Sequence, residues 1–459
     1  MSNTPGEGPA AGASPPTDAD RAWTFEAVES VSRTFALSIE LLEEPVASWV
    51  CTGYLLCRIA DTVEDDPSIP PRERADLLET YDAVLDPEDP TDADDFLAAV
   101  APHRPDDGGD DWAVVDRTPR VLAVFGSFDP TVRAAMREVV REMATGMAEF
   151  LREYADRGGL RLETVEELEE YCWYVAGTVG KLFSNLLAVH GTDGEADPED
   201  ARQFALLLQL VNIAKDVRDD YATENNVYLP GEWLREEGTD HESVADPDSA
   251  DAVARVVRRV TDRAAGYAPG ARRYLDTVPG DAGLLPAAAL PYLLALATVR
   301  ELDGRAREAV TSRGAVKIDR AEVKALYAAA DGGLDHEELD RLAAAVREEP
   351  YRPRRGRKRT TEFRYSTAMG SASSSTSSST SIPAERRNRR AAAAAPTPTT
   401  SRRPSGRARE PRERPDSDAS AETTGSSSPE PPREGAIVAS SRCISNRVMF
   451  IPPDGRLGA

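Results

Sequence analysis

Residues 54–66 read YLLCRIADTVEDD, and residues 209–220 read QLVNIAKDVRDD. Each stretch contains two aspartates four residues apart. The two pairs are Asp61 with Asp65 and Asp216 with Asp220. Residues four apart lie on the same face of a helix, so each pair directs two carboxylates the same way. Because a hard divalent cation such as Mg²⁺ takes oxygen ligands, the two stretches predict two helical walls of one metal and diphosphate site.

The polar neighbours of each pair strengthen this prediction. Tyr54 and Arg58 precede the first pair at steps of three and four residues, and Gln209 and Asn212 precede the second pair within an otherwise apolar stretch. Alone, a DxxxD pattern in an acid-rich chain more often marks a solvated helix face. Buried polar groups need hydrogen-bond partners, so these aligned polar side chains indicate a surface that faces a ligand or a partner helix. We therefore expect the carboxylates to line an internal cavity.

The charge of the chain changes sign near residue 350. The whole chain of 459 residues has a net charge of −25, but residues 351–459 contain 21 basic and 10 acidic residues, which leaves −36 for residues 1–350. A net charge of this size makes the acidic part of the chain repel itself. This repulsion is tolerable where salt screens charges within a few ångströms. The composition therefore predicts a halophile-like protein from an organism with a salty cytoplasm. The acidic part has no basic stripe, which argues against a nucleic-acid partner.

Three regions follow from composition and periodicity. Residues 1–18 are rich in Gly, Pro, Ala and Ser and are expected to be disordered, residues 19–350 form one patterned domain, and residues 351–459 are a low-complexity, basic tail without the means to build a core. An alternative hypothesis is that the tail is a frameshift product, because its charge reverses so abruptly. The start of the chain lacks the basic and apolar regions of a secretory signal, so we expect a cytoplasmic protein.

The patterned domain is predicted to be all-α. Helical periodicity begins near Trp23, and no run of alternating β-branched residues suggests strands. Residues 86–111 are expected to be mostly an acidic loop, and the uncharged run 284–299 is expected to be a buried core helix, because it is short for a membrane span of about 20 residues. Further helices are predicted near 45–65, 130–156, 164–190, 199–222, 248–275, 283–312 and 319–346.

Six segments in order then resemble the squalene/phytoene synthase family, and squalene synthases within it. They are SRTFALSI (32–39), DTVEDD (61–66), GMAEFL (146–151), YCWYVAGTVG (171–180), QLVNIAKDVRDD (209–220) and GAVKI (314–318). The resemblance implies a single-domain isoprenoid synthase fold, a helical bundle with a central cavity. It also implies condensation of two farnesyl diphosphates to presqualene diphosphate, followed by reduction with NADPH to squalene.

The resemblance also assigns roles to residues. It implies catalytic roles for Tyr171, Arg33 and Arg58. Substrate contacts are implied for Ser32, Arg33, Tyr54, Arg58, Gln209, Asn212 and Lys215. Ligands for Mg²⁺ are implied at Asp61, Glu64, Asp65, Asp216, Asp219 and Asp220, and contacts to NADPH at Lys317 and Arg320. Arg58 is equally suited to an ion pair with a carboxylate. Aromatic faces attract cations, so Phe35 and Tyr54 are candidates to line a carbocation cavity, whereas Tyr174 and Phe183 fit this role less well than packing in the core.

The chain departs from the family pattern at three points. Lys215 stands where the family has arginine, and Asn226 stands where it has a phosphate-binding cation. After GAVKI the expected arginine is replaced by Asp319, with Arg320 following. Two alternatives therefore stay open: a phytoene or dehydrosqualene synthase without the reductive step, and a non-catalytic scaffold protein. Peripheral membrane contact through a helix is a further hypothesis, and the oligomeric state is not predicted.

Overall fold

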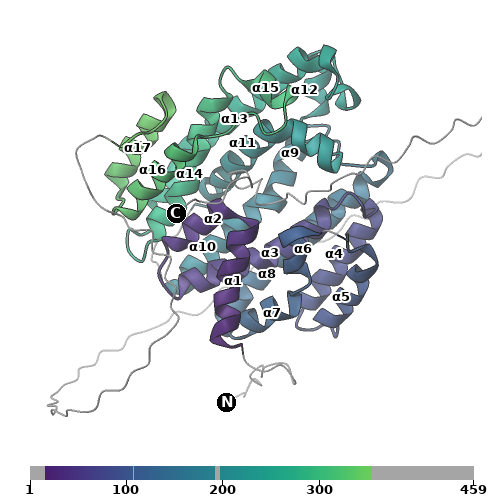
Figure 1. Cartoon of the computed structure of the whole chain (residues 1–459), viewed down its shortest axis with the longest axis vertical. Coiled ribbons are helices and arrows are strands. Elements are labelled where there is room, and N and C mark those ends of the chain that lie inside the picture. The colour runs from purple at the N-terminus through teal and green to yellow at the C-terminus, as the bar shows by residue number, and fades with distance from the viewer. Residues whose placement is uncertain (1–15, 107, 192–196, 354–459) are drawn as a thin grey trace, which may run out of the picture. The chain divides into compact units, whose positions relative to one another are not determined.

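The computed structural model describes residues 16–106, 108–191 and 197–353, which form helices and loops without a β-strand (Figure 1). This confirms the predicted all-α class. The α-helices are α1 (Asp18–Val31), α2 (Arg33–Glu40), α3 (Val46–Asp65), α4 (Pro71–Leu85), α5 (Ala93–Val100), α6 (Gly109–Val115), α7 (Thr118–Gly126), α8 (Pro130–Glu153), α9 (Val165–Cys172), α10 (Thr178–His190), α11 (Pro198–Glu224), α12 (Gly231–Glu236), α13 (Ala250–Asp276), α14 (Leu284–Leu302), α15 (Ala306–Thr311), α16 (Arg320–Asp331) and α17 (His336–Glu348). The short helical turns are η1 (Ala101–His103), η2 (Ala155–Arg157), η3 (Trp173–Gly177), η4 (His241–Ser243) and η5 (Pro247–Ser249).

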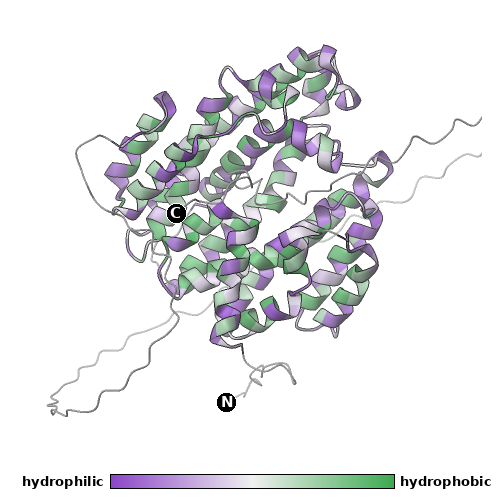
Figure 2. Ribbon diagram, in the orientation of Figure 1, coloured by the Kyte–Doolittle hydropathy of each residue, from purple (hydrophilic) through white to green (hydrophobic). Residues whose placement is uncertain are grey.

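The helices pack into one core around α3 and α11, which carry the two acidic stretches. Helix α11 packs along α13 and contacts α14 and α15, while α3 packs against α4, α6, α8 and α10. Figure 2 shows the hydropathy of each element. Helix α14 was predicted as a core helix, and it contacts α2, α11, α13, α16 and α17. Within the described residues it is the one helix long and apolar enough to cross a membrane, and 78% of its most apolar window is buried in the chain.

Several helix ends follow local sequence signals. Thr17 caps α1 and Thr164 caps α9, each in a capping box whose third helical residue is acidic. Asp129 caps α8, and Pro130 occupies the first helical position, where no hydrogen bond is lost. Gly191 ends α10 with φ of 93°, a left-handed conformation that favours glycine. These signals explain why the predicted bounds of the long helices lie close to the observed ones.

The prediction of an acidic loop at 86–111 is wrong for much of that segment. Helices α5 and α6 and the turn η1 lie there. Asp92 caps α5 in a capping box with Asp95, and Phe96 and Val100 are buried against the core. The predicted helices at 283–312 and 319–346 are also each divided, the second at Gly333, whose φ is 96°. In segments this short, the hydrophobic periodicity covers too few turns to outweigh the acidic composition, which favours a loop.

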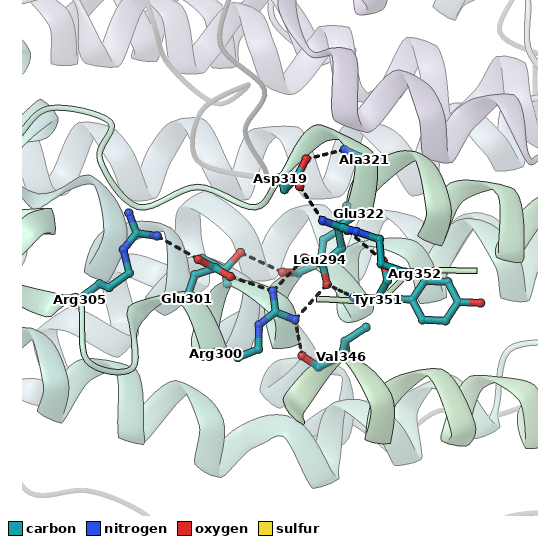
Figure 3. A network of polar contacts seen from close by, with 11 residues as sticks. Leu294, Arg300, Glu301, Arg305, Asp319, Ala321, Glu322, Val346, Tyr351 and Arg352 are labelled. Atoms are coloured by element: carbon teal, nitrogen blue, oxygen red, sulfur yellow. Dashed lines mark hydrogen bonds and ion pairs between the residues drawn. The ribbon is translucent and has the colours of Figure 1, made fainter. Parts of the chain in front are cut away.

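The last described residues are tied to the helical core (Figure 3). The Arg300 guanidinium donates to both oxygens of the buried Glu322 carboxylate, at 2.9 and 2.8 Å. The backbone N–H of Tyr351 donates to the same carboxylate at 2.8 Å, and Arg352 donates to Asp319 at 2.6 Å. The packed domain therefore continues through residue 352. Most of the predicted N-terminal segment and of the predicted tail lies outside the described residues.

Candidate functional site

Helix α3 gathers three carboxylates in its last turns. Asp61, Glu64 and Asp65 each place one ligand oxygen within 4.8 Å of the others, and all three side chains are buried. Their exposed fractions are 0%, 0% and 5%. Buried, convergent carboxylate oxygens are the donor set that Mg²⁺ prefers. The structure thus brings together the three ligands predicted in the first acidic stretch.

Arg58 lies one turn before this cluster and is fully buried. Its Nη1 donates to Asp61 at 3.2 Å, its Nε donates to Asp111 Oδ1 at 2.8 Å, and its Nη2 also contacts Asp111. The carboxylate ion pair that the sequence left open is therefore the arrangement in this structure. Burial raises the pKa of Asp111, and the Arg58 charge opposes that rise. Asp111 lies on α6, where Trp112 donates to Asp66 at 3.0 Å.

In the second acidic stretch, on α11, two aspartates form ion pairs with cations. Lys215 forms an ion pair with the neighbouring Asp216. Burial raises the pKa of Asp216, while Lys215 and Lys317 lower it. Asp219, predicted as a metal ligand, accepts hydrogen bonds from Arg313 Nε and from the backbone N–H of Gly314, both at 2.7 Å. Asp216 and Asp220 are buried like the first pair, but a cluster of three ligand groups occurs, within the described residues, on α3 alone.

An apolar cavity lies between α2, α3, α10, α11, α13 and α14. Tyr54 and Gln209 line it, and each lies two turns before the acidic pair of its own helix. Phe35 and Phe183 also line the cavity, and the Phe35 ring stacks on Tyr54 with ring centroids 4.3 Å apart. Gln209 is 2% exposed, and its Nε2 has no hydrogen-bond partner. An unsatisfied buried amide on a cavity wall indicates a ligand-facing position.

A smaller cavity lies beside α11 and contains the predicted cofactor residue Lys317. Lys215, Asn212 and Thr34 line it too, together with apolar residues of α14 and α16. The Nδ2 of Asn212 and the Oγ1 of Thr34 are buried without hydrogen-bond partners. Arg320 does not line this cavity, because it is exposed at the first turn of α16. The structure therefore brings Asn212, Lys215 and Lys317 together and leaves Arg320 apart.

Tyr171 is buried but does not line the apolar cavity. Its ring stacks on Tyr228 with centroids 4.9 Å apart, and its hydroxyl donates to the Tyr228 hydroxyl at 3.3 Å. Asn226 Nδ2 donates to the same Tyr228 oxygen at 2.8 Å, and its Oδ1 accepts from the Leu160 N–H at 2.9 Å. Tyr174 also lies outside the apolar cavity, next to Gly146. Tyr171 thus belongs to a hydrogen-bonded aromatic cluster at the end of α11.

The first motif of the sequence supplies a helix start. Ser32 is buried, and its Oγ accepts from the Phe35 N–H at 3.3 Å as the N-cap of α2. Arg33 is exposed at the first position of that helix. Phe35, in the first turn of this helix, lines the apolar cavity. Sequence reasoning missed Asp111, Trp112 and Arg313, because their partners lie 53, 46 and 94 residues away.

Comparisons with known proteins agree with this architecture. The family model for squalene/phytoene synthase matches residues 28–322. The squalene synthase of Eremothecium gossypii is 28% identical over 63% of this chain and 63% of its own length. Squalene synthase 1 of Arabidopsis thaliana is 31% identical over 43% of this chain and 44% of its own length. The chain thus spans less than two thirds of the length of these relatives.

A solved complex of TcSQS with the ligand E5700 shares the fold. It aligns with a TM-score of 0.59 at 21% identity, over 72% of this chain and 98% of its own. The predicted isoprenoid synthase type of helical bundle is thereby confirmed.

Proposed function

The chain belongs to the squalene/phytoene synthase family, and from this premise we propose that it joins two farnesyl diphosphates head to head and reduces the product to squalene. The intermediate in this proposal is presqualene diphosphate, and the reductant is NADPH. One observation carries the proposal. Helices α3 and α11 each line the apolar cavity, and each holds buried aspartates about two turns beyond its last lining residue, Tyr54 or Gln209. This arrangement suits a substrate with an apolar chain and an anionic head.

The carboxylates of α3 suit the diphosphate end of the substrate. Asp61, Glu64 and Asp65 offer three convergent oxygens and would hold Mg²⁺. When bound, Mg²⁺ neutralises the charge that develops on a leaving diphosphate, without any proton transfer. Arg58 fixes the orientation of Asp61 through their ion pair. In the proposed enzyme, Arg58 therefore acts on the diphosphate through the carboxylate that it orients, with Asp111 as its second anchor.

The apolar cavity suits the prenyl chains and the cations that form when diphosphate leaves. Its walls are aliphatic and aromatic, and the stacked pair Phe35 and Tyr54 lies among them. Aromatic faces attract cations, and the exclusion of water protects a carbocation from hydrolysis. Burial keeps Tyr54 protonated, because it raises the pKa of the hydroxyl far above the neutral range. Tyr54 would therefore stabilise positive charge as a neutral ring.

The reductant would bind next to α11. Lys317 and Lys215 supply two positive charges to the smaller cavity, and Asn212 and Thr34 supply hydrogen-bonding groups that lack a protein partner. These groups fit an anionic molecule that carries an amide, as NADPH does. A synthase that stops at phytoene or dehydrosqualene has no use for such a site. A scaffold protein would not need three convergent buried carboxylates.

A product assay tests the proposal directly. The full-length chain is incubated in molar salt with Mg²⁺ and labelled farnesyl diphosphate, with and without NADPH, and the extracted products are separated by chromatography. Presqualene diphosphate without NADPH and squalene with it are the expected products. Dehydrosqualene in both conditions would replace the proposal with the non-reductive alternative. No turnover in either condition would favour the scaffold protein.

A further inference from the structure

Residues 313–319, RGAVKID, form a connection between α15 and α16 that we name the strap. One of its ends is fixed to α11 by a single carboxylate. Asp219 Oδ1 accepts from Arg313 Nε, and Asp219 Oδ2 accepts from the Gly314 N–H, both at 2.7 Å. Both oxygens of Asp219 are thus engaged by donors of one turn of the strap. Charge-assisted hydrogen bonds of this kind are about twice as strong as neutral ones.

The strap is also held from its other side. Arg305 Nη2 donates to the backbone oxygen of Ala315 at 2.8 Å, and Arg305 Nη1 donates to Glu301 at 2.9 Å. Val316 is 1% exposed and anchors the middle of the strap in the core. Asp319 caps α16 through the Ala321 N–H at 2.7 Å. With its backbone fixed at these points, the strap has little freedom to move its lysine.

The conformation of Gly314 determines where that lysine lies. Its φ is 56°, in the left-handed region, and a Cβ there would stand 2.6 Å from Lys317 Nζ and 3.9 Å from Asp219 Oδ2. The Lys317 side chain therefore folds back over the glycine, on the side that faces Asp219. From this position its charge reaches Asp216, whose pKa it lowers. Lys317 also lines the small cavity with Lys215.

We propose that Asp219 is a positioning residue that acts through Arg313 and Gly314 to place Lys317 for the reductive step. This inference rests on the proposed function. It replaces the predicted role of Asp219 as a metal ligand with a role in reductant binding. A carboxylate whose two oxygens already accept from the strap is oriented for that contact, and the cost of releasing it would oppose coordination of a metal. Condensation and reduction should therefore respond differently when the strap is loosened.

The test uses Arg313→Ala in the full-length chain. Arg313 has a half-exposed side chain outside both cavities, so its removal should leave the fold intact. We expect the dissociation constant of NADPH, measured by the fluorescence of the nicotinamide, to rise about tenfold. The KM for NADPH should rise with it. The rate of presqualene diphosphate formation without NADPH should stay within about twofold of the wild-type rate. Arg313→Lys, which keeps one donor, should restore part of the affinity.

Arg307→Ala is the matched control. Arg307 lies on α15, is similarly exposed and donates through Nε to Asp251 at 2.7 Å, away from the strap. It should leave NADPH affinity unchanged. Hydrogen–deuterium exchange supplies a readout independent of turnover, because the Gly314 amide is protected only while Asp219 accepts from it. Exchange at residues 314–318 should be faster in Arg313→Ala than in Arg307→Ala.

Two outcomes would overturn the proposal. Arg313→Ala could match Arg307→Ala in exchange and in NADPH affinity, which would mean that Asp219 does not hold the strap. Alternatively, both half-reactions could fall by the same factor, which would return Asp219 to the metal site or to a general structural role. Failure of the proposed function gives a separate result, the absence of presqualene diphosphate from the wild-type reaction, while the exchange experiment still tests the strap.

Discussion

Arg58 carries a full charge inside α3 and is compensated there by Asp61 and Asp111. Removing one partner of a buried ion pair leaves the other charge uncompensated, which is more costly than losing the attraction itself. Asp111 comes from α6, so its ion pair with Arg58 also attaches this short helix to α3, which carries the candidate metal ligands. The geometry of the first acidic stretch therefore depends on a residue outside every motif in the sequence.

Asp111→Ala should lower the free energy of unfolding by about 3–5 kcal/mol, the range for a broken buried pair. Asp110→Ala is the matched control, since Asp110 precedes it on the same helix and is exposed. It should change stability by less than about 0.5 kcal/mol. Denaturant unfolding in one fixed salt concentration measures both variants. Equal, small losses in the two variants would mean that Arg58 finds adequate compensation without Asp111.

At the scale of elements, two segments that resemble the family motifs pack directly on each other. Gly146 of α8 lies under the ring of Tyr174 in the π-helical turn η3, and a Cβ at Gly146 would stand 2.2 Å from a ring carbon. Gly146→Ala should therefore destabilise the protein by about 1–3 kcal/mol through overpacking. Gly266→Ala on α13, where nothing lies within 4 Å, should instead stabilise it by about 0.5–1 kcal/mol. Thermal unfolding compares the pair, and shifts of the same sign would contradict this packing.

One carboxylate also links three helices to one another. Glu169 of α9 accepts from Arg202 of α11 at 3.0 Å and from Arg263 of α13 at 2.6 Å, and Tyr267 also donates to it. Burial alone would raise the pKa of Glu169, but these donors outweigh it and lower the pKa below its ordinary value. A carboxyl with a lowered folded-state pKa stabilises the fold above its unfolded pKa of about 4.3.

Glu169→Gln should therefore cost about 1–2 kcal/mol at pH 7, a modest figure because Arg202 and Arg263 stay about one third exposed to screening solvent. The difference between variant and wild type should shrink as the pH falls below about 4, through the lowered pKa. Glu170→Gln, at the exposed neighbouring position, should show neither effect. Unfolding curves from pH 3 to pH 7 measure the difference, and a gap that stays constant would contradict the assigned cause.

Sequence signals predicted the long helices because each has many periods and clear caps, as at Asp129 and Gly191. They did not predict α5 and α6, whose seven or eight residues lie among acids that also suit a loop. In the candidate site, the aspartates and Gln209 were predicted because helical spacing aligns them. Asp111 and Arg313 were not, because their partners are distant in sequence and only packing brings them together.

At the scale of the whole molecule, we expect net charge to affect stability. Residues 1–350 carry a net charge of −36, which repels itself in dilute buffer. Raising KCl from 0.1 M to 2 M shortens the Debye length from about 10 Å to below 3 Å, so the thermal midpoint should rise. Sucrose of equal osmolality, which does not screen charge, is the control and should raise it less. A midpoint that falls in KCl would contradict the proposed halophilic origin, which remains a prediction together with the cytoplasmic location.

The proposed function depends above all on the carboxylates of α3 holding the metal that receives the diphosphate. Paramagnetic resonance of Mn²⁺, titrated into the full-length chain with a slowly reacting farnesyl thiodiphosphate, measures that binding without turnover. Asp65→Asn should weaken Mn²⁺ binding at least tenfold relative to wild type. Glu73→Gln, at an exposed position on α4, should leave it unchanged. Equal affinity in wild type and Asp65→Asn would contradict the claim and move the metal site away from α3.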